Sequence, residues 1–182
     1  MGEKQVEATV IRLRDVHITK IIASPLKRTI QTAQAIAKKH NLPVNLEPSI
    51  LETNHGVWEG TNATLIRELW PDIYNDWKEH PSGVIFPRGE AFVDTYRRVH
   101  IWWVDFLENI DSGTTVVVTN DNIIRALLVN LLEKELDAIW EFNLQPTGIT
   151  HIAVESGSST VLYINDTCHL DGLQANLAKH AL

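Results

Sequence analysis

Residues 18–29, ITKIIASPLKRT, decide the fold class of this 182-residue chain. The β-branched run from Ile18 to Ala23 predicts a short strand. Ser24 followed by Pro25 is typical of a helix N-cap and a proline at the first helical position, so we expect a helix to about His40. Arg28 would lie in its first turn, where a guanidinium can bind phosphate through two hydrogen bonds. A solvent-exposed helical arginine fits the same spacing equally well, so both interpretations stay open.

Helical and strand-like patterns alternate along the rest of the chain. We expect further helices over residues of about 3–14, 63–79 (two short ones, split near Pro71), 90–110 and 123–132. The other expected strands cover residues 43–46, 114–118, 149–154 and 160–164. The run Thr114 to Val118 has the composition of a fully buried strand. This alternation predicts an α/β sandwich with a largely parallel sheet.

Composition limits the function classes. The chain has 44% apolar and 21% charged residues, which suits one globular domain over residues 1–182. Its net charge of −7 argues against nucleic acid and anionic membrane as partners, so an anionic ligand needs a local site. No apolar stretch reaches the ~20 residues that span a bilayer. The single cysteine, Cys168, cannot form an internal disulfide, and we expect a cytoplasmic protein.

Two more segments carry groups that suit chemistry at strand ends, where open α/β sheets bind ligands. In LETNHGVWEG (residues 51–60), Glu52 and His55 lie three residues apart in a predicted loop beside Trp58. A glutamate screened by an aromatic ring can have a raised pKa and protonate a leaving oxygen. A carboxylate that only braces the loop is the simpler alternative. In VTNDNIIR (residues 118–125), Asn120 or Asp121 follows a strand and can cap a helix.

Together the three segments resemble the histidine phosphatase superfamily, the phosphoglycerate-mutase-like proteins, in order and spacing. SPLKRT (24–29) resembles the family's Ser-Pro-Leu-x-Arg segment, and LETNHGVWEG resembles its Leu-x-Glu-x-x-x-Gly-x-Trp-Glu-Gly stretch. PRGE (87–90) and NDTCHL (165–170) resemble its Gly-Glu helix start and its terminal tail. The resemblance implies a three-layer sandwich with a mostly parallel central sheet, Arg28 as the phosphate clamp and Glu52 as the catalytic acid.

Within this superfamily the chain is most similar to the metal-independent phosphoserine phosphatases. The short region between Gly60 and Gly89, the His55-Gly56-x-Trp58 variant and the Thr-Cys-His-Leu tail carry that similarity. It implies that His55 and His169 contact the carboxylate of the substrate. An ordinary loop or tail histidine explains each at least as well. Of the other histidines, none is expected near the site.

The family pattern breaks at both catalytic histidines. The family passes its phosphoryl group to a histidine in an Arg-His-Gly motif after the first strand. Gly2 and Gln5 resemble the Gly-x-x-Gln that opens the family's first helix, so that strand and motif would lie upstream of Met1, and the domain is expected to be truncated. We expect the absent strand between the strands that end at Ala23 and near Thr119. Asn120 replaces the second histidine; an amide can donate a hydrogen bond to phosphate but cannot form a phosphorylated intermediate.

Three readings of function follow. The first is a catalytically impaired family member that binds a small phosphorylated metabolite or acts as a partner subunit, as a homo-oligomer or with an intact relative. The second is an active phosphomonoesterase or mutase whose N-terminal catalytic segment is outside this sequence. The third is a flavodoxin-like binding domain, which leaves three ordered motifs to coincidence. We expect no cofactor and no metal, since Asp121 and His55 are too few ligands.

Overall fold

The computed structural model describes residues 1–176. Its helices are α1 (Gly2–Leu13), α2 (Lys27–His40), α3 (Ala63–Leu69), α4 (Pro71–Glu79), α5 (Phe92–Asn109) and α6 (Asp121–Leu131). Its strands are β1 (Ile18–Ala23), β2 (Asn45–Leu46), β3 (Thr114–Val118), β4 (Ile149–Glu155) and β5 (Ser158–Asp166). Every predicted element is present, and β1 and β3 have the predicted bounds. None of the helices in this part of the chain is long and apolar enough to cross a membrane.

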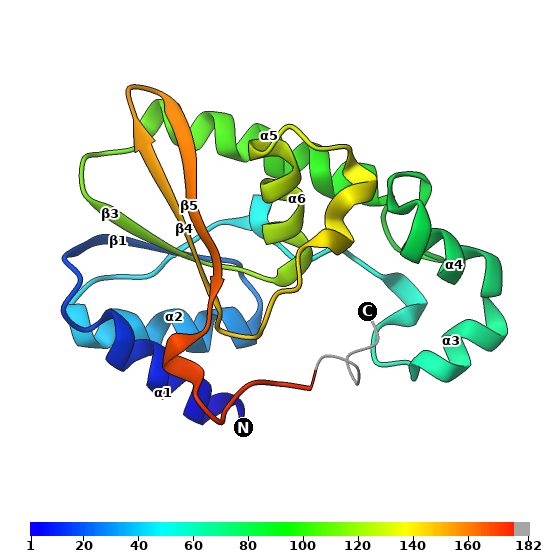
Figure 1. Cartoon of the computed structure of the whole chain (residues 1–182), viewed down its shortest axis with the longest axis horizontal. Coiled ribbons are helices and arrows are strands. Elements are labelled where there is room, and N and C mark those ends of the chain that lie inside the picture. The colour runs from blue at the N-terminus through cyan, green and yellow to red at the C-terminus, as the bar shows by residue number, and fades with distance from the viewer. Residues whose placement is uncertain (177–182) are drawn as a thin grey trace.

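The elements form three layers. Strands β2, β1 and β3 make a parallel sheet in that order, and β4 pairs with β5 as an antiparallel hairpin. In Figure 1, α1 and α2 lie on one side of the strands, and α5 and α6 lie on the other. The predicted α/β sandwich with a parallel sheet is therefore confirmed, while the β4–β5 pair is the antiparallel part of the fold.

Strands β1 and β3 are direct neighbours. They pair from Ile18 opposite Thr114 to Ala23 opposite Val118, and the pairing continues where the Ser24 N–H donates to the Val118 carbonyl at 3.0 Å. The expectation of another strand between them is wrong, because their backbone groups already hydrogen-bond to each other. Among the described strands, β3 has no partner on its other side.

Two local predictions are also wrong. β3 is not fully buried, because four of its residues are partly exposed and Thr114 is exposed. Ser24 does not cap α2: the N-cap residue is Leu26, and no side chain caps that end. Ser24 still belongs to the sheet, and its carbonyl accepts a hydrogen bond from Thr29 Oγ1 at 2.7 Å, so the helix begins later than the Ser-Pro pair suggests.

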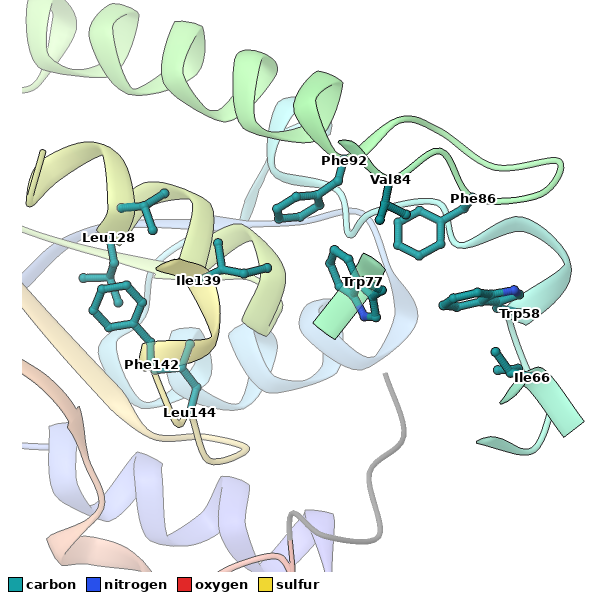
Figure 2. Close-up of a cluster of buried hydrophobic side chains, with 11 residues drawn as sticks. Trp58, Ile66, Trp77, Val84, Phe86, Phe92, Leu128, Ile139, Phe142 and Leu144 are labelled. Atoms are coloured by element: carbon teal, nitrogen blue, oxygen red, sulfur yellow. The ribbon is translucent and has the colours of Figure 1, made fainter. Parts of the chain in front are cut away.

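Aromatic residues of α4 and of the segments on either side of it, together with aliphatic residues of α3 and α6, form the largest core cluster (Figure 2). Trp77 is fully buried at its centre and packs edge-on against Phe92 at 4.9 Å and Phe86 at 5.0 Å between ring centroids. Trp58, which lies within the predicted loop, is also fully buried and packs edge-on against Phe86 at 5.2 Å. Edge-to-face packing of this kind is favourable beyond the burial itself. The cluster fixes the segment that carries Glu52 against the helices.

Candidate functional site

Arg28 and Asn120 meet at the carboxyl ends of β1 and β3. Arg28 lies in the first turn of α2, Asn120 is the N-cap residue of α6, and the Arg28 Nε–H donates to Asn120 Oδ1 at 2.7 Å. The two residues are 92 positions apart in sequence, and the parallel pairing of β1 with β3 brings them together. The predicted association of these two site residues is present in the structure.

Asn120 keeps a hydrogen-bond donor for a ligand. Its side chain is 7% exposed, and within the described chain its buried Nδ2 has no hydrogen-bond partner. The oxygen is already occupied by Arg28, so the amide orientation is set and the NH₂ group is the free end. A buried donor without a partner costs about 1–3 kcal/mol, which an anionic oxygen bound there would offset. Arg28 itself is exposed, so its remaining N–H groups are accessible.

Glu52 is held as a neutral acid. Burial of its carboxyl group, followed by the negative charge of Asp121, raises the pKa of Glu52 to about 8, although the N–H of Thr53 and the charge of Arg28 oppose that shift. Part of the side chain reaches the surface, but its Oε1 accepts a hydrogen bond from the Thr53 N–H at 2.9 Å within the loop. At neutral pH the carboxyl group therefore carries a proton that it can donate.

The loop that carries Glu52 is braced from the start of α5. Glu90 Oε1 accepts the Asn54 N–H at 2.7 Å, and the Asn54 carbonyl accepts the Glu90 N–H at 2.9 Å. Arg98 Nη2 donates to the same Glu90 oxygen at 3.1 Å. Gly56 has a φ of +58°, and a Cβ on it would collide with the Pro87 carbonyl, so only glycine fits there. Glu90 thus braces this loop, as does Glu59, whose Oε1 accepts the His55 N–H at 3.2 Å. The role of Glu52 as the catalytic acid stays a prediction.

A second arginine anchors the start of α6. Arg125 Nη1 donates to Asp121 Oδ2 at 2.7 Å and to Asn122 Oδ1 at 3.1 Å, and its Nε donates to the Phe142 carbonyl at 3.2 Å. The side chain is 8% exposed. Sequence reasoning did not select Arg125, although its spacing of four residues from Asp121 is the spacing of a helical ion pair. It holds Asp121 near Glu52.

His55 is part of the core. Its side chain is 6% exposed, its ring packs edge-on against Phe86 at 4.6 Å, and burial lowers its pKa. Asn122 Nδ2 lies 3.3 Å from His55 Nε2 and donates to it, since the Asn122 oxygen accepts from Arg125. The lowered pKa favours the neutral imidazole, whose Nε2 is engaged by Asn122, and its role in binding a substrate carboxylate stays a prediction.

His169 lies beside α1 rather than beside Arg28. Its Nε2 is 3.2 Å from Thr9 Oγ1 and 3.1 Å from the Thr147 carbonyl. Because the Thr9 hydroxyl donates to the Gln5 carbonyl at 2.9 Å, it accepts from the imidazole. Gln5 also donates to the Leu173 carbonyl at 2.8 Å. These contacts tie the tail to α1, and a contact between His169 and a substrate is a prediction that the geometry leaves open.

Arg28, Glu52 and Asn120 line one large cleft of about 2130 Å³. Neither His55 nor His169 lines it, whereas His151 does, from β4, with its ring edge-on to Tyr163 at 5.2 Å between centroids. In the region from residue 1 to 176, no histidine is hydrogen-bonded to Arg28, Glu52 or Asn120.

Several cations line the cleft although the protein is acidic overall. Lys78 and Arg125 line it with Arg28. The Lys78 Nζ lies 4.1 Å from the centre of the Trp140 ring, and burial, followed by the charge of Arg125, lowers the pKa of Lys78. The local anion site expected from the sequence stays a prediction, which these cations support. In the described residues no three acidic, histidine or cysteine side chains are grouped to hold a metal ion.

The chain is similar to known proteins over most of its length. A sequence model of the histidine phosphatase superfamily (branch 1) matches residues 1–167. Phosphoserine phosphatase 1 of Hydrogenobacter thermophilus is 34% identical over 169 residues, which cover 93% of this chain and 80% of that protein.

Solved structures show the same fold. YhfR of Bacillus stearothermophilus is 24% identical with a TM-score of 0.87, over 93% of this chain and 84% of that one. A phosphoserine phosphatase mutant from Entamoeba histolytica, in complex with phosphoserine, is 25% identical with a TM-score of 0.76, over the same shares of the two chains. By sequence and by fold, the chain belongs to the histidine phosphatase superfamily.

Proposed function

We propose that these residues form the phosphate-binding part of a phosphomonoesterase site of the phosphoserine or phosphoglycerate type, and that they bind a phosphomonoester with little or no turnover. The observation that carries this proposal is the Arg28–Asn120 pair, which offers guanidinium N–H groups and a free buried amide donor at two adjacent strand ends. Helix N-termini and arginines at strand ends favour phosphate. The similarity to a phosphoserine phosphatase supports the class of ligand.

Impaired catalysis follows from the chemistry of Asn120. An amide carries no positive charge, forms no phosphorylated intermediate and shuttles no proton. Removal of one electrostatic donor from an active site costs ~10²–10³ in rate, and removal of a nucleophile costs far more. Glu52 can still protonate a leaving oxygen, but protonation alone does not replace the nucleophile.

The biological role that suits such a chain is a cytoplasmic partner subunit or phosphoester-binding protein, as a homo-oligomer or beside an intact relative. The half-exposed state of β3 supports a role in assembly, because isolated domains seldom leave a β-branched strand of a parallel sheet partly open.

Calorimetric titration with inorganic phosphate and with phosphoserine tests the binding proposal. We expect weak binding that Arg28→Ala reduces by about tenfold or more, since one charge-assisted bidentate contact is lost. Lys27→Ala is the matched control, because Lys27 is an exposed cation in the same helical turn. Absence of heat with the unaltered protein, or equal losses in both variants, would contradict the proposed site.

An assay with phosphoserine and p-nitrophenyl phosphate, with and without magnesium, tests the proposed impairment. We expect no release of phosphate above background from the 182-residue chain. Robust turnover by a homogeneous preparation, abolished by Arg28→Ala, would contradict the proposed loss of catalysis. It would leave the proposed phosphate-binding site unaffected.

A second candidate is an active phosphomonoesterase that needs an additional N-terminal catalytic segment. The specific observation in its favour is Glu52, whose pKa of about 8 suits a general acid at neutral pH. The coding sequence upstream of the Met1 codon tests it. An in-frame Arg-His-Gly segment, and turnover by the longer protein, would establish this candidate; a stop codon directly upstream would eliminate it.

A further inference from the structure

The indole ring of Trp140, in the 3₁₀ turn Leu136–Glu141, is held against α4. Its Nε1–H donates to the Trp77 carbonyl at 2.6 Å, and the two indole rings pack edge-on with their centroids 5.1 Å apart. Trp77 is itself fully buried in the core. Because a hydrogen bond and ring packing both fix it, the Trp140 ring is a firmly placed part of the cleft wall.

Two cations from separate helices contact this ring. Lys78 Nζ, from α4, lies 4.1 Å from the ring centre, and Arg125 Cζ, from α6, lies 4.7 Å from it. A cation at such a distance is attracted by the electron-rich face of an indole. The Trp140 ring therefore brings two positive charges close together in the wall of the cleft.

Lys78 has no negatively charged partner. Among the described residues its ammonium group contacts the rings of Trp140 and Tyr74, the latter at 5.6 Å, and forms no ion pair or hydrogen bond. A third cation, Arg67 of α3, lies 5.1 Å from the centre of the Tyr74 ring. Burial, followed by the charges of Arg125 and Arg67, lowers the pKa of Lys78. Like charges gathered in this way repel each other, and a bound anion offsets that repulsion.

Contacts connect these cations to the phosphate-binding pair. Arg125 Nη1 donates to Asp121 Oδ2 at 2.7 Å, and Asp121 directly follows Asn120, which accepts the hydrogen bond of Arg28. Lys78, Arg125 and Arg28 line the same cleft. A ligand with its phosphate at Arg28 can therefore extend along α6 toward Lys78. Of these cations, Lys78 is the one without an acceptor, since Arg125 is bonded to Asp121.

Lys78 is also open to a ligand. The residue as a whole is exposed, whereas one side of its ammonium group lies against the partly buried Trp140 ring. Three N–H donors remain for an acceptor. An ammonium group screened on one side by a ring interacts more strongly with a carboxylate than a fully hydrated one does, because the effective dielectric constant is lower.

We propose that Lys78, placed by the Trp140 ring, binds a carboxylate of the phosphomonoester and so selects phosphorylated hydroxy acids. This inference rests on the proposed phosphate site and adds the class of ligand. A phosphorylated amino acid fits less well, since its ammonium group would lie among cations. Lys78 thus takes the role that the family resemblance gave to His55 and His169, neither of which lines the cleft.

Calorimetric titration with 3-phosphoglycerate, phosphoserine and propyl phosphate tests the selection. All three carry the phosphate, propyl phosphate has no carboxylate, and phosphoserine adds an ammonium group. We expect 3-phosphoglycerate to bind about tenfold tighter than propyl phosphate, with phosphoserine between them, because one hydrogen bond between charged groups is added. Lys78→Met keeps the length of the side chain and should remove most of this preference, whereas Lys78→Arg should keep it. An unchanged preference in Lys78→Met, or tighter binding of phosphoserine than of 3-phosphoglycerate, would overturn the inference.

Two further variants separate this inference from the phosphate site. Lys39→Met removes an exposed cation of α2 that does not line the cleft, and it should leave the preference unchanged. Equal losses in Lys39→Met and Lys78→Met would mean a long-range effect of net charge and would overturn a local role of Lys78. Arg28→Ala should weaken all three ligands by a similar factor. Binding of 3-phosphoglycerate that depends on Lys78 but not on Arg28 would overturn the phosphate site alone, and no binding of any ligand would overturn both.

The indole N–H signal of Trp140 in NMR spectra, assigned with Trp140→Phe, reports the place of binding. We expect saturating 3-phosphoglycerate to shift this signal more than propyl phosphate does, because only the carboxylate reaches Lys78. The indole signal of Trp58, which is fully buried and does not line the cleft, is the internal control and should stay in place. Equal shifts of the Trp140 signal with both ligands would overturn the proposed contact.

Discussion

Strands β1 and β3 are neighbours of similar composition with different surroundings. β1 pairs with β2 on one side and β3 on the other, and Ile21 and Ala23 are fully buried. Among the described strands, β3 pairs with β1 alone, and each of its residues is at least partly exposed. The difference shows that strand composition indicates a tendency to be buried, whereas the number of neighbouring strands decides whether burial occurs. The side of β3 away from β1 lines the open cleft.

Substitution of one register pair tests this difference most strongly. Ile21 lies opposite Val116 in the sheet. We expect Ile21→Ala to lower the free energy of unfolding by about 2–5 kcal/mol, because it leaves a cavity in a closed core. Val116→Ala should lower the free energy of unfolding by about 1 kcal/mol or less, since the Val116 side chain is already partly exposed to the cleft. Urea denaturation of the two variants measures both, and equal losses would mean that β3 is as enclosed as β1.

The arginines that follow the two strands extend the comparison. Arg125 is 8% exposed and bonded to Asp121, Asn122 and the Phe142 carbonyl, whereas Arg28 is exposed. We expect Arg125→Ala to cost roughly 2–3 kcal/mol of stability, less than a fully buried pair because Asp121 is 41% exposed. Arg28→Ala should change stability by less than about 1 kcal/mol. Thermal unfolding of the two variants at pH 7 measures the difference. A larger loss of stability for Arg28→Ala than for Arg125→Ala would mean that Arg28, and not Arg125, is the structural arginine.

Glu52, which lines the same cleft as β3, gives a smaller effect that depends on pH. The folded state holds the proton of Glu52 up to a pKa of about 8, while the unfolded state releases it near the ordinary value of 4.5. Between these values the folded state binds more protons, so stability falls as pH rises through this window. Glu52→Gln should therefore raise the melting temperature at pH 8–9 and leave it nearly unchanged at pH 4.5.

Melting curves of the unaltered protein and Glu52→Gln across this pH range check the sign. A higher melting temperature of Glu52→Gln at low pH instead, or no difference at any pH, would mean that water enters the cleft and hydrates the Glu52 carboxyl group.

Sequence patterns predicted the local elements well, because each depends on neighbours in the chain. The bounds of β1 and the break at Pro71 between α3 and α4 are examples. The association of Arg28 with Asn120 followed from motif resemblance and from the rule that parallel strands end together. The order of strands could not be predicted, since β-branched runs do not specify their partners, and the expected strand between β1 and β3 was therefore misplaced. His55 likewise gave no sign in the sequence that aromatic rings would enclose it.

The most direct test of the account is the assay of Asn120→His for phosphatase activity and for phosphate binding together. The account predicts that the variant still binds phosphate through Arg28 but releases none from phosphoserine or p-nitrophenyl phosphate, because one added imidazole in the 182-residue chain supplies no second catalytic histidine. Turnover by Asn120→His would contradict it, since the described residues would then contain a complete catalytic site.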